Sequence, residues 1–118
     1  MRFLKLLMIS WFFLSACGSD ESQTGNTVTV SDFAFSPKEI TVHVGQSVHW
    51  QLNSQMMHNV KTGTNCTEAT QNGEDMDNDF DPTHTTFDHV FATAGDVPYF
   101  CEYHCASNGM TGIVHVVP

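Results

Sequence analysis

The chain has little positive charge. Only 4 of its 118 residues are Lys or Arg, against 13 Asp and Glu, so the formal net charge is −9 with histidine neutral. A surface that binds nucleic acid needs clustered basic side chains to neutralise phosphates. We therefore expect no nucleic-acid partner. An acidic surface suits transient docking to a basic patch on another protein, or serves solubility.

Long apolar runs are also missing. The run Leu6–Leu14 has nine residues, which is short of the ~18 that a membrane-spanning helix needs but fits a signal peptide. It ends in Leu14-Ser15-Ala16-Cys17, which resembles the bacterial lipoprotein processing signal. We accordingly expect a signal peptide over residues 1–16 and a lipid on Cys17, although an ordinary secretory peptide is the alternative.

This interpretation predicts an envelope protein that is anchored to a membrane only by lipid. It would lie in the periplasm, on the outer membrane if the cell has two membranes. Residues 17–26 would form a flexible tether, and residues 27–118 a single folded domain. Removing residues 1–16 leaves Lys38 and Lys61 as the only basic residues, and the formal net charge becomes −11.

The mature chain lacks a convincing helical period. Its short, alternating runs are rich in β-branched and aromatic residues and are separated by Gly, Pro, Asn or Asp. Seven such strands are expected, at residues 27–30, 40–44, 47–52, from His58 onward, 85–91, 97–101 and 112–117. This spacing predicts an all-β protein, a Greek-key β-sandwich of about seven to eight strands.

The segment 64–83 does not fit the strand pattern. Its aspartates invite a calcium interpretation, but a twelve-residue loop starting at Asp77 would have Pro82 at the sixth position, where glycine is required. We expect a solvated acidic loop, with adventitious cation binding as the alternative.

Four residues form a candidate metal site. Cys101, His104 and Met110 lie within ten residues of one another between two predicted strands, and His58 precedes Cys101 by 43 residues. Two imidazoles, a thiolate and a more distant thioether are the ligands of a trigonal copper site with a weak axial bond. Such a site suits both Cu(I) and Cu(II), so electron transfer needs little rearrangement. We expect no enzymatic activity, because the chain shows no nucleophile constellation or second metal cluster.

The string from Tyr99 to Val114 resembles the cupredoxin family, particularly plastocyanin- and pseudoazurin-like proteins. In these proteins a Cys-x-x-His…Met loop precedes a Gly-x-Val strand, and the likeness extends over most of residues 27–117. The resemblance implies one type 1 copper held by His58, Cys101, His104 and axial Met110. It also implies that hydrogen bonds from Asn59 tie the ligand segments together. The five residues between His104 and Met110 make this loop one residue longer than in those relatives.

By the same resemblance, the chain would be a monomeric single-electron carrier in the cell envelope. Its partners would be redox proteins, and basic docking patches on them would suit its acidic surface. A copper-delivery protein of the same fold is the alternative. Of the other histidines, His43, His49 and His115 occupy the polar phase of strands and should be exposed. Neither they nor His84 and His89 are expected to bind metal.

Two cysteines remain once Cys17 carries lipid and Cys101 binds copper. In an oxidising envelope, Cys66 and Cys105 predict one disulfide. The proposed fold brings their loops together at the copper end, where the bond would restrain His104. One alternative is two unrelated thiols. The other is a structural zinc site made from Cys66, Cys101, His104 and Cys105, which would leave His58 and Met110 without a role.

Overall fold

The computed structural model describes residues 25–118. The signal peptide expected over residues 1–16, the lipid site Cys17 and most of the 17–26 tether lie outside the described residues. Within residues 25–118, no helix is long and apolar enough to cross a membrane.

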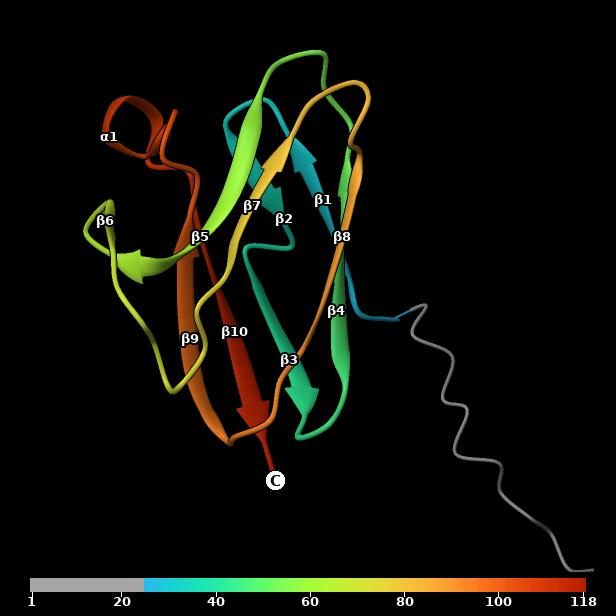
Figure 1. The fold of residues 1–118 in the computed structure, drawn as a ribbon, viewed down its shortest axis with the longest axis vertical. Helices are drawn as coiled ribbons and strands as arrows, with labels where there is room; N and C mark the ends of the chain where they lie inside the picture. The colour runs from blue at the N-terminus through green and yellow to red at the C-terminus, as the bar shows by residue number, and fades with distance from the viewer. Residues whose placement is uncertain (1–24) are drawn as a thin grey trace, which may run out of the picture.

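Two β-sheets face each other (Figure 1), and an apolar core fills the space between them. The strands are β1 (Thr27–Ser31), β2 (Ala34–Ser36), β3 (Glu39–His43), β4 (Ser47–Leu52), β5 (His58–Thr64), β6 (Thr67–Glu68), β7 (Asp77–Phe80), β8 (Thr86–Val90), β9 (Gly95–Phe100) and β10 (Thr111–Val117). The helix α1 (Cys105–Asn108) is a single turn between β9 and β10.

The strand order is that of a Greek-key sandwich rather than a simple meander. One sheet has the order β2-β1-β4-β8, and the other has β3-β10-β9-β5-β6, with β7 also paired to β5. The pairs β1–β4 and β3–β10 are parallel, whereas all other pairs are antiparallel. The prediction of an all-β sandwich is confirmed.

Alternation along the strands builds the core. In β1, Val28 and Val30 point inward while their neighbours are partly exposed, and Val114 in β10 repeats the pattern. Trp50 of β4 is fully buried and meets the edge of the Tyr99 ring, with ring centroids 5.5 Å apart. Each sheet therefore has one apolar face, and burying both faces against each other is the main force that holds the sheets together.

The structure has ten strands among the described residues, so the expected seven to eight is too low. The three unexpected strands, β2, β6 and β7, contain two to four residues each, too few for alternation to stand out. The expectation of a solvated loop at 64–83 is also wrong for its second half. There β7 pairs with β5, and both Met76 and Phe80 are buried. Backbone pairing with β5 supplies hydrogen bonds to β7, while Asp77 and Asp79 face solvent.

Candidate metal centre

Three segments bring the metal-ligand candidates to one end of the sandwich. His58 is the first residue of β5, Cys101 follows the last residue of β9, and His104 lies just before α1. Because β5 and β9 are antiparallel neighbours, with Lys61 opposite Phe100, the start of β5 lies beside the end of β9. Residues 43 positions apart in the chain thus become neighbours.

The three donor atoms form a compact triangle. His58 Nδ1 lies 3.1 Å from His104 Nδ1, and Cys101 Sγ lies 3.5 Å from His104 Nδ1 and 3.9 Å from His58 Nδ1. Metal–nitrogen and metal–sulfur bonds of about 2.0–2.3 Å place ligand atoms roughly 3–4 Å apart, so this donor set fits one metal ion. It is the only such group of His, Cys, Asp or Glu found among residues 25–118.

His58 and Cys101 lie deeper in the protein than His104. Both side chains are fully buried, whereas His104 retains partial exposure at the rim. Burial lowers the pKa of His58 from its ordinary value of 6.5, against the opposing effect of the nearby Asp32 carboxylate. The imidazole is therefore neutral near pH 7, which is the form that binds a metal.

Met110 directly precedes β10 and is only 1% exposed. Its carbonyl accepts a hydrogen bond from the Cys101 N–H at 3.0 Å, so the loop is closed onto its own start. The helix α1 lies between His104 and Met110. It ends at Gly109, whose φ of 64° is left-handed and favours glycine, and whose N–H donates to the Cys105 carbonyl.

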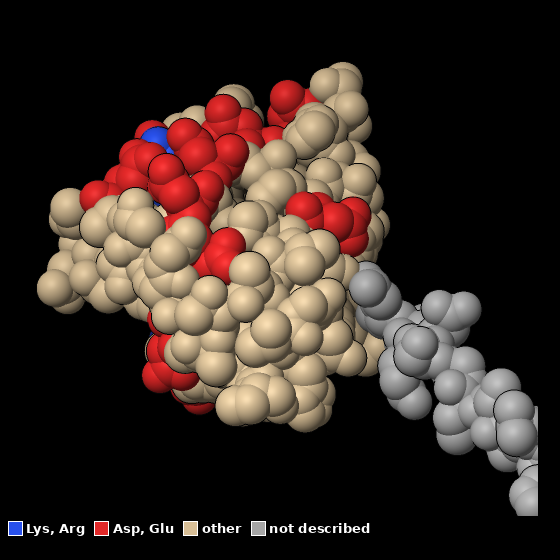
Figure 2. All heavy atoms as spheres, turned by 60° about the horizontal axis from the view of Figure 1, so that its bottom comes forward, with Lys and Arg blue, Asp and Glu red and all other residues tan. Residues whose placement is uncertain are grey.

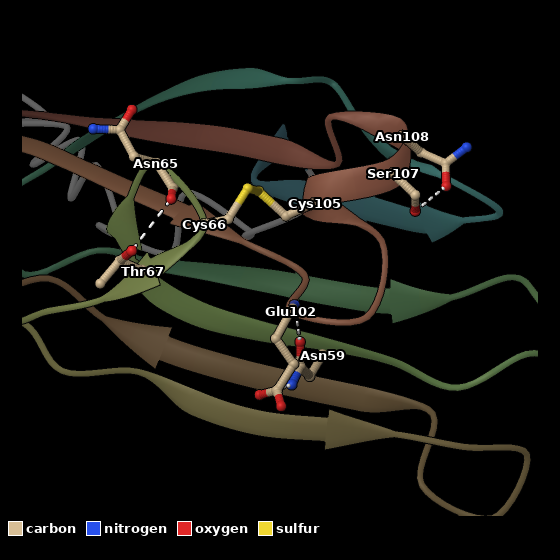
Figure 3. Close-up of a disulfide and its surroundings, with 8 residues drawn as sticks. All are labelled: Asn59, Asn65, Cys66, Thr67, Glu102, Cys105, Ser107 and Asn108. Atoms are coloured by element: carbon tan, nitrogen blue, oxygen red, sulfur yellow. Dashed lines mark hydrogen bonds between the residues drawn. A yellow bond between two sulfur atoms is a disulfide. The ribbon is translucent and has the colours of Figure 1, made fainter.

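Asn59 links the two ligand segments (Figure 3). Its Oδ1 accepts a hydrogen bond from the Glu102 N–H at 2.8 Å, and its Nδ2 donates to Glu102 Oε2 at 2.9 Å. Lys61 Nζ lies 2.6 Å from the same carboxylate. The Lys61 ion pair and then the Asn59 amide lower the pKa of Glu102, and Glu102 in turn raises the pKa of Lys61. Asn59 could be predicted from the sequence resemblance, whereas no local pattern marks Glu102 or Lys61.

A disulfide joins Cys66 to Cys105, with Cα atoms 5.6 Å apart (Figure 3). Cys66 lies in the turn between β5 and β6, and Cys105 begins α1 directly after His104. The bond therefore ties the ligand loop to the neighbouring hairpin. Neither sulfur is a free thiolate, which leaves the zinc alternative with only two of its four ligands. Cys101 is the free cysteine among the described residues.

The remaining histidines lie away from this triangle. His43 is exposed as expected, but His49 and His115 are half-buried because each packs against carboxylates of neighbouring strands. His49 Nδ1 lies 2.8 Å from Asp88, and His115 Nδ1 lies 2.7 Å from Asp96. Neither belongs to the candidate metal group, nor do His84 and His89.

The chain belongs to the family of copper binding proteins that contains plastocyanin and azurin, which its residues 22–117 match. The chloroplastic plastocyanin of Tetradesmus obliquus is 32% identical over 84 residues, covering 70% of this chain and 57% of that protein. A second chloroplastic plastocyanin, from Physcomitrium patens, is 32% identical and is covered to 49%. The chain thus spans about half the length of these curated relatives.

Solved structures show the same fold. The oxidised plastocyanin of Dryopteris crassirhizoma superimposes with a TM-score of 0.65 at 22% identity, covering 77% of this chain and 99% of that one. A purple cupredoxin from Nitrosopumilus maritimus gives 0.63 at 21% identity, with 77% and 98% covered. The predicted family, fold class and copper cofactor are confirmed.

Proposed function

We propose that this chain is a type 1 copper protein that carries single electrons, and that it is not an enzyme. The observation that carries the proposal is the buried triangle of two imidazoles and one thiolate, already at metal-ligand spacing. His58, Cys101 and His104 would hold the copper, with Met110 as the weak axial ligand. Bound copper would supply a Cu(II)/Cu(I) couple.

Rigidity of the ligand segments supports rapid electron exchange. The Asn59–Glu102 hydrogen bonds hold the segment after Cys101, while the disulfide holds the segment after His104. A ligand set that cannot relax has one geometry for both oxidation states. Little reorganisation then accompanies each electron, which favours a carrier over a protein that must release its metal.

Electrons would enter and leave through the partly exposed edge of His104. The Phe33 ring meets this imidazole edge-on, with ring centroids 5.0 Å apart, and the Tyr103 ring centroid lies 6.4 Å from it. Phe33, Met56, Met57 and Tyr103 are exposed large apolar side chains. They would form a small docking patch suited to the weak encounters of redox proteins.

An acidic cluster would set the rate and salt dependence of these encounters. Lys61 Nζ lies 3.2 Å from Glu68 Oε2, 3.9 Å from Asp77 Oδ1 and 2.6 Å from Glu102 Oε2. Figure 2 shows a small basic area enclosed by acidic residues on the face that it draws. A redox partner with a basic patch fits this surface. We further propose that the protein is a monomer in the bacterial cell envelope, anchored through a lipid on Cys17.

The visible spectrum tests the copper site. Residues 18–118 should turn intensely blue or green on adding Cu(II), and should bleach and recover reversibly on reduction and reoxidation. Cys101→Ser and His58→Gln should lose this colour, whereas His49→Gln, a control outside the triangle, should keep it. A colourless protein that binds Zn(II) more tightly than copper would contradict the proposal.

Voltammetry distinguishes a carrier from a copper-delivery protein. A carrier should give a reversible one-electron wave and keep its copper through many cycles in the presence of a Cu(I) chelator. Loss of copper to the chelator upon each reduction would favour delivery instead.

A further inference from the structure

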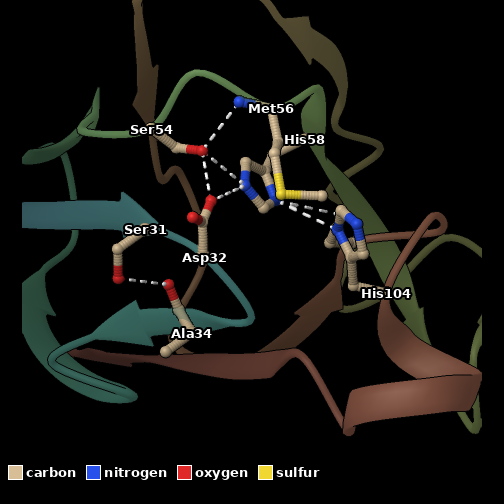
Figure 4. A network of polar contacts seen from close by, with 8 residues as sticks. Ser31, Asp32, Ala34, Ser54, Met56, His58 and His104 are labelled. Atoms are coloured by element: carbon tan, nitrogen blue, oxygen red, sulfur yellow. Dashed lines mark hydrogen bonds and ion pairs between the residues drawn. The ribbon is translucent and has the colours of Figure 1, made fainter.

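The turn between β1 and β2 lies against both histidines of the triangle. Asp32 and Phe33 are the two residues between the paired Ser31 and Ala34. Asp32 Oδ1 lies 3.3 Å from His58 Nε2, and the Phe33 ring packs edge-on against His104. Figure 4 shows the Asp32 carboxylate directed at the side of the His58 ring that faces away from His104.

The backbone of this turn is unusual. Phe33 has a φ of 66°, a left-handed conformation that is uncommon for a large side chain. Such conformations persist where the surrounding structure requires them, often at functional sites. Here the conformation accompanies a turn that directs one side chain to each imidazole.

Hydrogen bonding around Asp32 permits one arrangement of protons. Ser54 Oγ contacts both Asp32 Oδ1 and His58 Nε2, the latter at 3.2 Å, and accepts a hydrogen bond from the Met56 N–H at 2.9 Å. An ionised carboxylate only accepts, so the single Ser54 hydroxyl proton is directed to Asp32. Asp32 Oδ1 and Ser54 Oγ can then only accept a hydrogen bond from His58 Nε2. Nε2 must therefore carry the imidazole proton.

This arrangement determines which nitrogen can bind metal. With its proton on Nε2, neutral His58 has its free lone pair on Nδ1, the atom that faces Cys101 Sγ and His104 Nδ1. The ring is fully buried in the intact protein, so bulk water does not reach Nε2 while Asp32 and Ser54 are in place. The network therefore holds both the tautomer and the orientation of His58.

We propose that Asp32 is a positioning residue for the metal centre, and that its negative charge lowers the reduction potential. The second part rests on the proposed electron-carrier function. A carboxylate that accepts the distal N–H of a metal-bound histidine makes the imidazole a stronger donor. A stronger donor and a nearby negative charge both stabilise Cu(II) more than Cu(I).

The reduction potential of Asp32→Asn tests the charge. The amide keeps the size of the side chain and one acceptor oxygen but removes the charge. Removing such a partner typically weakens metal binding 10–100-fold. Because the lost charge and donor strength act mainly on Cu(II), we expect the ratio of Cu(II) affinity to Cu(I) affinity to fall about tenfold. For one electron, tenfold corresponds to a potential raised by about 59 mV.

Asp88→Asn is the matched control. Asp88 is also a half-exposed carboxylate paired with a histidine, with its side chain 59% exposed against 53% for Asp32, but its partner His49 lies outside the triangle. The control should shift the potential far less than Asp32→Asn. Equal shifts in a coloured, redox-active protein would overturn the proposed charge effect while leaving the electron-carrier proposal intact. A wild-type protein without a reversible copper centre would instead overturn the proposed function.

Nitrogen-detected NMR of the copper-free protein tests the positioning without any metal. At a pH where His58 is neutral, its ring should be the Nε2–H tautomer, with a slowly exchanging proton. Asp32→Ala should speed that exchange at least tenfold, whereas Asp88→Asn should not change it. A wild-type His58 protonated on Nδ1, or an exchange rate unaffected by Asp32→Ala, would overturn the proposed positioning role.

Discussion

Removal of the disulfide between Cys66 and Cys105 should cost the domain a large part of its stability. The two residues are 39 positions apart, and the chain-entropy description assigns a loop of this length about 4 kcal/mol. Small domains have total stabilities of about 5–15 kcal/mol. A loss of this size should lower the melting temperature by roughly 15–30 °C, at 4–8 °C per kcal/mol.

Urea unfolding of the copper-free protein measures this loss. The double variant Cys66→Ala/Cys105→Ala should unfold at a much lower urea concentration than the wild type. The double variant removes both the disulfide and the packing of the buried Cys105 side chain. Reductant added to the wild type breaks only the disulfide, so it separates the two contributions to stability. It should bring the wild type to nearly the stability of the variant, and should leave the variant unchanged.

Two results would refute this reasoning. One is a loss below about 1 kcal/mol, well under the usual 2–5 kcal/mol for native disulfides. The other is three free thiols, instead of one, in denatured copper-free residues 18–118. The double variant should still turn blue or green with Cu(II), because neither cysteine belongs to the donor triangle.

Three further predictions concern the axial ligand and two charged side chains. Met110→Leu should keep the colour and raise the reduction potential, because the axial thioether bond stabilises Cu(II) and the variant lacks it. A lower potential in voltammetry would argue against an axial Met110. Two carboxylates raise the pKa of His115 above 6.5, so it stabilises the fold below about pH 6.5, and this contribution disappears as pH rises through the folded pKa. His115→Gln should therefore lose stability relative to wild type in urea unfolding at pH 5.5 but not at pH 8.5; an equal loss at both would contradict this. Lys61→Gln should lower the free energy of unfolding by about 1 kcal/mol, since three carboxylates lose their shared cation. The control Lys38→Gln removes a basic residue that has no ion pair in the described structure, and it should change stability by less than about 0.5 kcal/mol. Equal losses in the two variants would refute the stabilising role of the Lys61 cluster.

The ligand residues could be recognised from the sequence because their chemistry is rare and their spacing is local. Cys101, His104 and Met110 lie on one loop, and a thiolate, an imidazole and a thioether seldom occur together by chance. Asp32, Glu102 and Lys61 carry no such signal, since a charged residue in a turn or strand is ordinary. Their contacts with ligand segments arise only after strands distant in sequence pair.

The strand β7 shows the same limit for the fold. Asp77–Phe80 is polar apart from Phe80, and a four-residue strand with one inward side chain has no visible alternation. Its strand conformation comes from backbone pairing with β5 and from the buried Met76 and Phe80 side chains. Neither the backbone pairing nor the burial of these side chains can be evaluated before the position of β5 is known.

By itself, the sequence determined the class of the protein, because period-two alternation selects strands and two imidazoles with a thiolate select copper. It also gave Cys66 and Cys105 no other expected role, which suggested that they form a disulfide. Only the tertiary structure decided how the site is held. Antiparallel pairing of β5 and β9 brings His58 to Cys101, and the β1–β2 turn brings a carboxylate to the far nitrogen of His58. Such contacts depend on distances across the fold, which local residue patterns do not encode.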